Sequence, residues 1–168
     1  SGLYNLSRNL GLVTGACLAH LGNHVRVVDI DAARIARLNG GHVPIHEPGL
    51  DELVAEGLAN GRLSFHAQQA ATYGSRLVIV AVGTLDQAGE WTGALVEQAV
   101  ALLAQDLQAP RHLVVRSTLM PGTAVRLETT ARAIDPTIRL CFNPEFTREA
   151  VAVRDFLAPY LPAPVVVK

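Results

Sequence analysis

The chain has 168 residues, of which 49% are hydrophobic and 17% are charged, and its formal net charge is −1. This length fits one domain with a substantial core, and the absence of a basic stripe excludes a nucleic-acid-binding surface. The longest apolar runs have strand length, well short of the roughly 20 residues of a membrane-spanning helix. An apolar stretch after Arg8 faintly resembles a signal peptide, but Gly11, Thr14 and Gly15 interrupt it. We therefore expect a cytoplasmic α/β domain with neither a nucleic-acid nor a membrane partner.

Strands and helices alternate along the chain. Strands are predicted from apolar, β-branched runs over Gly2–Leu6, Val25–Asp29, Leu63–His66, Leu77–Val82, His112–Arg116, Ile138–Phe142 and Val165–Val167. Helices are predicted from apolar spacing over Gly11–Leu21, Ala32–Leu38, Leu50–Leu58, Ala94–Leu107 and Thr123–Ile134. This alternation predicts a Rossmann-like, doubly wound, mainly parallel sheet with helices on both faces.

The segment Gly11–Asp31 has most features of a dinucleotide-binding unit. Gly11 would let a helix N-terminus approach a ligand closely, while Gly15 and Ala16 would let that helix lie close to a sheet. Asp29 follows the second predicted strand, where an acid accepts hydrogen bonds from ribose hydroxyls. The strand and glycine turn expected before this helix are degenerate.

Small or polar residues follow four predicted strands. They are Asp29, Gly83-Thr84, Ser117-Thr118 and Asn143-Pro144-Glu145. Because ligands of doubly wound sheets bind at the carboxyl ends of the strands, we expect these residues to line one crevice. The structural alternatives are that Asp29 only caps a turn and that Thr84 or Thr118 only caps the following helix.

Neither cysteines nor histidines indicate a further reactive site. Cys17 and Cys141 fall in a predicted helix and strand, where they behave as small hydrophobes rather than as a disulfide or a nucleophile. The two histidine pairs spaced by four residues are interrupted by loop residues, so no metal site is predicted. These pairs are His20/His24 and His42/His46.

Seven segments together resemble the NAD-binding N-terminal domain of UDP-glucose/GDP-mannose 6-dehydrogenases. They are GLVTGACLA, VDID, PIHEPGLDEL, GRLSF, IVAVGT, VVRSTLMPGT and NPEFTREAVAVRDF. The resemblance implies NAD as cofactor, with Gly11 at the helix start, Asp29 on the adenosine ribose and Arg34 beside the adenosine. It also places Thr84 and Thr118 on the nicotinamide side and Gly83 among the cofactor-binding residues. An acid at Asp29 would repel a 2′-phosphate and so favours NAD over NADP.

The resemblance further implies oxidation of the C6 alcohol of a nucleotide sugar to a carboxylate with two NAD. Thr118 would contact the cofactor and position the hydrolytic water, and Glu149 would contact the cofactor and activate that water as a base. Glu145 would face the sugar. The structural alternative for Glu149 is an acid that opens a helix at the favourable end of its dipole.

The chain departs from the family pattern at its start. The first two fingerprint glycines fall at Leu6 and Arg8, where Leu6 obstructs the turn and Arg8 occupies the phosphate position. Arg8 pairing with the pyrophosphate is the alternative, and impaired NAD binding is the stronger expectation. Leu85 also replaces the usual proline, and Trp91 either covers the cofactor or packs.

Two classes of function stay open. The first is the NAD-binding part of a nucleotide-sugar 6-dehydrogenase. The resemblance implies that the family's nucleophilic cysteine, with its lysine and asparagine partners, lies outside these residues, as does the dimer helix. Catalysis, binding of the nucleotide-sugar partner and formation of a homodimer would therefore depend on parts of the protein outside these 168 residues. The second class is a non-catalytic, truncated or degenerate nucleotide-binding or interaction module. UDP-glucose and GDP-mannose stay open as substrates.

Overall fold

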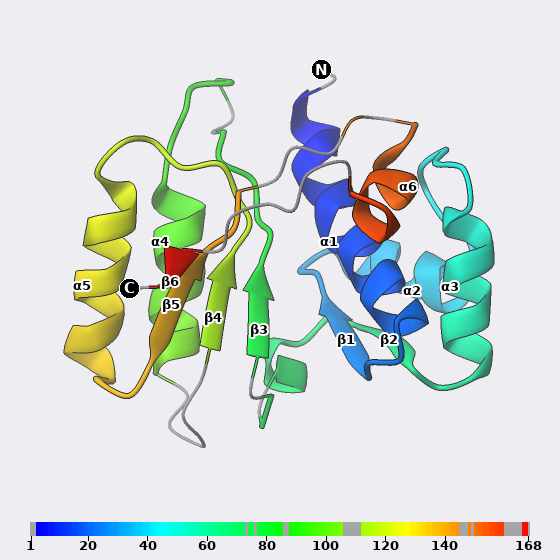
Figure 1. Cartoon of the computed structure of the whole chain (residues 1–168), viewed down its shortest axis with the longest axis horizontal. Coiled ribbons are helices and arrows are strands. Elements are labelled where there is room, and N and C mark those ends of the chain that lie inside the picture. Colours follow the sequence, from blue (N-terminus) through cyan, green and yellow to red (C-terminus); the bar gives the residue numbers. More distant parts are fainter. Residues whose placement is uncertain are drawn as a thin grey trace. The chain divides into compact units, whose positions relative to one another are not determined.

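The computed structural model describes residues 3–72, 74–75, 77–85, 88–105, 112–144, 148, 150–159 and 166–167. Helices and strands alternate along the chain, and they form two compact units (Figure 1). The β1 unit contains Asn9–Thr72 and Phe146–Pro162, and the β3 unit contains Ser1–Arg8, Tyr73–Glu145 and Ala163–Lys168. No helix among the described residues has both the length and the hydropathy needed to cross a bilayer.

The β1 unit is built on a pair of parallel strands. Its elements are α1 (Leu3–His20, from Asn9 onward in this unit), β1 (Val25–Val28), α2 (Ala32–Asn39), α3 (Leu50–Ala59), β2 (Leu63–His66), the 3-10 helix η1 (Gln69–Thr72) and α6 (Ala152–Leu157). β1 and β2 pair with Val25 opposite Leu63. The Asp31 side chain caps α2 by accepting a hydrogen bond from the Arg34 N–H at 2.9 Å. Such a cap satisfies an amide that the helix leaves without a partner.

The core of the β1 unit forms where α1 packs on the sheet. Leu12, Ala16, Leu50 and Phe65 are among its buried residues. A Cβ atom at Gly15 would lie 2.6 Å from Val27 Cγ2, closer than any real contact. The prediction that Gly15 brings this helix close to a strand is therefore confirmed.

The β3 unit contains a four-stranded sheet. Its elements are β3 (Leu77–Val80), α4 (Ala94–Ala104), β4 (His112–Val115), α5 (Thr123–Ile134), β5 (Arg139–Phe142) and β6 (Val166–Val167). The strand order is β3-β4-β5-β6, with the first three strands parallel and β6 antiparallel to β5. α4 and α5 pack on each other and on this sheet around Val80, Val100, Leu113 and Leu127 (Figure 1).

The mixed α/β class with mainly parallel strands and flanking helices is confirmed, but the predicted first strand is wrong. Residues 3–6 and the predicted turn Ser7–Leu10 belong to α1, which is one continuous helix. The cause is local: no glycine or proline interrupts the chain between Leu3 and Leu10, and Leu3, Leu6 and Leu10 recur at helical spacing. Without that strand, the structure has two separate sheets in place of the single predicted one.

Candidate functional site

Asp29 lies immediately after β1 and is held in a defined orientation. Its backbone N–H donates to the His66 carbonyl at 3.1 Å. Its Oδ1 accepts a hydrogen bond from the Asp31 N–H at 3.0 Å, and its Oδ2 lies 3.9 Å from Arg34 Nε. The side chain of Asp29 stays 21% exposed, whereas that of Arg34 is only 8% exposed. An oriented, partly exposed carboxylate of this kind can accept hydrogen bonds from the hydroxyls of a ligand.

Gly11 lies inside α1 rather than at its start. α1 begins at Leu3, so Gly11 is well past the first turn, where amides lack intrahelical partners. The prediction that a helix starts at Gly11 is therefore wrong. Leu6 and Arg8 lie in the same continuous helix. A role for Gly11 in cofactor binding stays a prediction.

In the β3 unit, Ser117 joins the ends of β3 and β4. Its Oγ accepts a hydrogen bond from the Val82 N–H at 3.1 Å and donates one to the Val82 carbonyl at 2.8 Å. Ser117 is 5% exposed, so this hydroxyl serves both backbone groups of Val82 in a buried place. Gly83 and Thr84 follow directly and are half-buried, while Thr118 is exposed. The hydrogen-bonded pair of Val82 and Ser117 thus lies beside the residues predicted for the site, which are Gly83 and Thr84 after β3 and Thr118 after β4.

The next strand end is joined in a similar way. An Nη atom of Arg116 donates to Asn143 Oδ1 at 3.0 Å, and the Asn143 N–H donates to the Val115 carbonyl at 3.0 Å. These bonds connect the carboxyl ends of β4 and β5. Within the β3 unit, the three predicted strand ends thus share one edge of the sheet.

The predicted loop Gly83–Gly93 contains a short turn with strand-like pairing. The Thr92 N–H donates to the Thr84 carbonyl at 2.7 Å, and Leu85 and Trp91 form an antiparallel bridge. Trp91 is 55% exposed. Its indole is therefore not part of either core, and whether it covers a cofactor stays a prediction.

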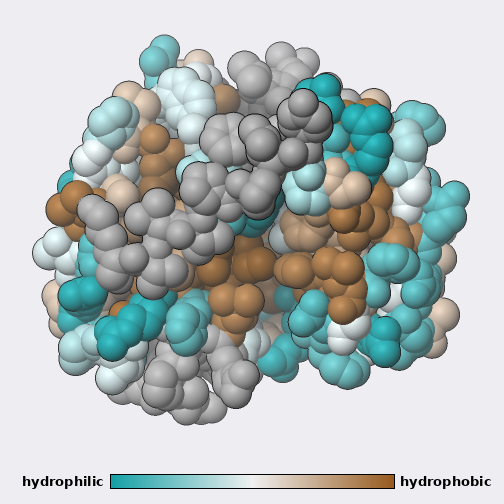
Figure 2. All heavy atoms as spheres, in the orientation of Figure 1, coloured by the Kyte–Doolittle hydropathy of each residue, from teal (hydrophilic) through white to brown (hydrophobic). Residues whose placement is uncertain are grey.

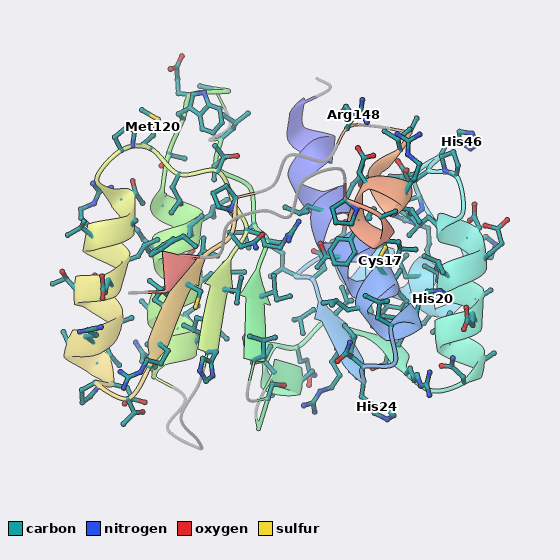
Figure 3. All side chains as sticks on the ribbon, in the orientation of Figure 1. Cys17, His20, His24, His46, Met120 and Arg148 are labelled. Atoms are coloured by element: carbon teal, nitrogen blue, oxygen red, sulfur yellow. The ribbon has the colours of Figure 1, made fainter. Side chains whose placement is uncertain are left out.

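Glu145 and Glu149 lie outside the described residues, so their predicted roles stay predictions. Beside Glu149, Ala150 has a φ of 62°, a left-handed conformation that non-glycine residues seldom adopt. Arg148 donates hydrogen bonds to Asp155, and this lowers the pKa of the Asp155 carboxyl. Arg148 is labelled in Figure 3, near α6.

Glu47 is a buried acid whose role the sequence interpretation missed. It is 6% exposed, and its Oε1 accepts a hydrogen bond from the Val153 N–H at 3.3 Å. The bond connects the PIHEPGLDEL segment to α6, across 106 residues of sequence. The Gly49 φ of 83° turns the chain here, directly before α3. The sequence offered the family segment PIHEPGLDEL, which contains Glu47, but neither that resemblance nor an acid between two loop residues predicts burial.

The cysteines carry no reactive site. Cys17 and Cys141 are both buried and unpaired by disulfide. Cys17 is labelled in Figure 3. Burial, and secondly the charge of Glu47, raises the pKa of its thiol to about 11. The thiolate that a nucleophile needs is therefore disfavoured at Cys17. Among the described residues, no group of three or more His, Cys, Asp or Glu side chains could hold a metal ion.

Replacing Ser117 with alanine should lower the free energy of unfolding of the β3 unit by about 2 kcal/mol. The change leaves the Val82 N–H and carbonyl without their side-chain partner in a buried place, and each unsatisfied group costs roughly 1–3 kcal/mol. Urea unfolding followed by circular dichroism measures the difference. Thr118→Ala is the matched control, because that neighbouring hydroxyl is exposed, and an equal loss in both variants would contradict the explanation.

The comparisons with known proteins all match this chain to UDP-glucose and GDP-mannose dehydrogenases. The family described as "UDP-glucose/GDP-mannose dehydrogenase family, NAD binding domain" matches residues 9–161. UDP-glucose 6-dehydrogenase of Rhizobium meliloti (strain 1021) is 39% identical over 155 residues, which are 89% of this chain and 36% of that protein. GDP-mannose 6-dehydrogenase of Azotobacter vinelandii is 35% identical over 161 residues, with 89% and 37% covered.

Solved structures give the same result. A GDP-mannose dehydrogenase from Pseudomonas aeruginosa superposes with a TM-score of 0.80 at 29% identity, covering 88% of this chain and 36% of that one. A UDP-glucose dehydrogenase from Pyrobaculum islandicum superposes with a TM-score of 0.79 at 33% identity, covering 89% and 37%. The chain thus spans little more than a third of the length of these relatives. It belongs to the UDP-glucose/GDP-mannose dehydrogenase family, as an NAD-binding domain of that family.

Proposed function

We propose that this chain binds the adenosine end of NAD through Asp29. The observation that carries the proposal is the orientation of the carboxylate, with Oδ1 held by the Asp31 N–H and Oδ2 3.9 Å from Arg34 Nε. Its remaining acceptor positions suit two adjacent ribose hydroxyls. A negative charge there opposes a 2′-phosphate, which favours NAD over NADP.

The pyrophosphate end of NAD fits this chain less well. A dinucleotide pyrophosphate lies against a glycine turn and the first amides of the following helix. Here α1 continues through Leu6 and Arg8, where the family's first two fingerprint glycines would fall. The residues present therefore suit the adenosine ribose but not the close approach of the phosphates. We expect weak NAD binding, dominated by the adenosine end.

In the whole protein, this domain would serve the oxidation of a nucleotide-sugar C6 alcohol to a carboxylate. Named relatives include both a UDP-glucose and a GDP-mannose 6-dehydrogenase, so both sugars stay candidates. The resemblance assigns Thr84 and Thr118 to the nicotinamide side of the cofactor and Gly83 to cofactor binding. It assigns Glu145 to the sugar, and Glu149 to the cofactor and to activation of the hydrolytic water. The nucleophilic cysteine would come from outside these residues, because Cys17 and Cys141 are buried. A homodimer and a cytoplasmic location remain part of this proposal.

A second candidate is a non-catalytic nucleotide-binding or interaction module. The continuous α1 favours it, because this helix replaces the strand and turn that precede the phosphates in dinucleotide-binding folds. Such a module would keep the fold while losing high affinity for NAD.

Titration of the chain with NAD distinguishes these proposals. We expect millimolar NAD to raise the midpoint of thermal unfolding, as a ligand that binds only the folded state does. Asp29→Ala should weaken NAD binding by about tenfold to a hundredfold, since hydrogen bonds to a charged group contribute roughly 1.5–3 kcal/mol. Asp51→Ala removes an equal charge from the exposed first turn of α3 and is the matched control.

Each result of the titration supports or contradicts one part of the proposal. If NAD stabilises none of the chains, the non-catalytic module is the better proposal. If NAD stabilises both variants as well as the parent chain, binding occurs but Asp29 does not hold the ribose. If NADP stabilises the chain as strongly as NAD, the charge argument at Asp29 is wrong.

A further inference from the structure

The strands β1 and β2 of the β1 unit have two faces of opposite character. On the face toward α1, the side chains nearest to Gly15 are those of Val25, Val27 and Leu63. Figure 2 shows hydrophobic side chains on the surface around β1. Side chains alternate between the two faces of a strand. The residues between these valines, and the residues that pair with them, therefore lie on the opposite face.

The opposite face of β1 and β2 is polar. In the parallel register of the two strands, Arg26 pairs with Ser64, and Val28 pairs with His66. Arg26 is exposed, whereas Ser64 and His66 are half-buried. A guanidinium, a hydroxyl and an imidazole therefore lie next to one another on this face.

A pocket lies beside this polar face, where the chain leaves β2 and enters η1. The 3-10 helix η1 lies against β1, and the pocket has a volume of about 460 Å³. Small-molecule sites typically measure about 300–1,000 Å³. The residues that line the pocket all belong to the β1 unit, and they are Arg26, Phe65, His66, Ala67, Gln68 and Ala71.

Three of the lining side chains carry hydrogen-bond donors, and none of the described residues that line the pocket is an acid. Arg26 supplies a permanent positive charge, and Gln68 supplies an amide group. The Nε2 atom of His66 lies 2.9 Å from Ser64 Oγ, and this hydrogen bond orients the imidazole. When the Ser64 hydroxyl donates in that bond, the Nδ1 atom of His66 carries the ring proton and can donate to a ligand. The lining therefore suits an anion.

We infer that this pocket binds the phosphate monoester of a small organic molecule. A guanidinium matches the spacing of phosphate oxygens and can donate two parallel hydrogen bonds to them. A phosphate monoester offers three terminal oxygens to the three donor-bearing side chains, whereas a carboxylate offers two.

The size of the pocket calls for an organic part. A phosphate group is only a few times larger than a water molecule, which takes up about 30 Å³ in the liquid. The organic part would lie against the small side chains of Ala67 and Ala71. Neither Asp29 nor Arg34 lines this pocket, so the inference does not depend on NAD binding.

Titration of the full chain with phenyl phosphate, followed by proton–nitrogen NMR correlation spectra in a phosphate-free buffer, tests the inference. We expect saturable shifts of the backbone amide signals of His66, Gln68 and Ala71. Phenol, which lacks the phosphate, should cause no such shifts. Inorganic phosphate should bind about tenfold more weakly than phenyl phosphate, because it has no apolar part to bury.

Variants of single side chains identify the binding groups. Arg26→Met removes the charge but keeps a long, unbranched side chain, and it should weaken the binding of phenyl phosphate by about tenfold to a hundredfold. Arg62→Met removes an equal charge from an exposed residue outside the lining and is the matched control, which should bind like the parent chain. Gln68→Ala alters another exposed lining residue and should weaken binding about fivefold, also if Arg26→Met does not fold.

Three outcomes would overturn the inference. The first is the absence of saturable shifts with phenyl phosphate. The second is equal weakening in Arg26→Met and Arg62→Met, because net charge alone would then explain the attraction. The third is inorganic phosphate binding as tightly as phenyl phosphate, which would show an adventitious ion only.

A cross-comparison separates this inference from the proposed binding of NAD. Asp29→Ala should leave the binding of phenyl phosphate unchanged, and Arg26→Met should leave the stabilisation by NAD unchanged. A loss of both activities in either variant would contradict two separate sites.

Discussion

Replacing Gly15 with alanine is expected to lower the free energy of unfolding of the β1 unit by about 2 kcal/mol. In an exposed helix position the same change stabilises by about 1 kcal/mol, because alanine has the better helix propensity. Here the added Cβ would lie 2.6 Å from Val27 Cγ2, so the Val27 side chain or α1 itself must shift. Overpacking of this kind costs typically 1–3 kcal/mol. Urea unfolding of the parent and variant chains measures the difference.

A double-mutant cycle with Val27→Ala shows whether the contact is the cause. Removing the Val27 methyl groups opens space for the new Cβ, so Gly15→Ala should cost less than about 1 kcal/mol in that background. An unchanged cost would mean that the loss arises elsewhere, for example from a changed helix geometry. Cys17 and Leu12 lie in the same core cluster and stay unaltered in both backgrounds.

Stability should also fall between pH 9 and pH 11 because of Cys17. Burial, and secondly the charge of Glu47, raises the pKa of this thiol from 9.0 to about 11. In the unfolded chain the thiol loses its proton near pH 9, while the folded chain keeps it until about pH 11. The unfolded state therefore gains relative stability as pH rises through this window. A shift of this size corresponds to about 3 kcal/mol, present below pH 9 and lost by pH 11.

The comparison of pH profiles isolates this thiol from other groups that titrate above pH 9. Cys17→Ala should have lower stability near neutral pH but should lose about 3 kcal/mol less between pH 9 and pH 11. Glu47→Gln removes the nearby charge and should reduce the loss in part. Equal slopes for the parent chain and Cys17→Ala would contradict the assignment. The same raised pKa predicts that Cys17 stays unlabelled by thiol reagents at pH 8 until the chain unfolds.

The candidate functional site could be predicted only in part, because sequence patterns reveal local features and not hydrogen bonds between residues distant in sequence. Asp29 follows an apolar strand and Asp31 precedes an amphipathic helix, and both are found where these patterns placed them. Ser117 was expected at a strand end, but its bond to Val82 spans 35 residues and has no sequence signature. The Glu47 bond to Val153 is of the same kind. Glu145 and Glu149 lie outside the described residues, so their roles stay predictions.

The sequence by itself determined most of the elements after the first helix, because each depends on a short apolar run and on the glycines and caps that bound it, but η1 and α6 were not predicted. It also determined the family, since the motifs around Asp29, Ser117 and Asn143 are specific. Residues 3–10 were predicted wrongly although their signal is local, because helical spacing without a breaker prevailed over a fingerprint without its glycines. Only the tertiary structure decided the strand order, in which β1 pairs with β2 and β3 pairs with β4. Strand pairing joins residues distant in sequence, so this order becomes visible only once the chain is folded.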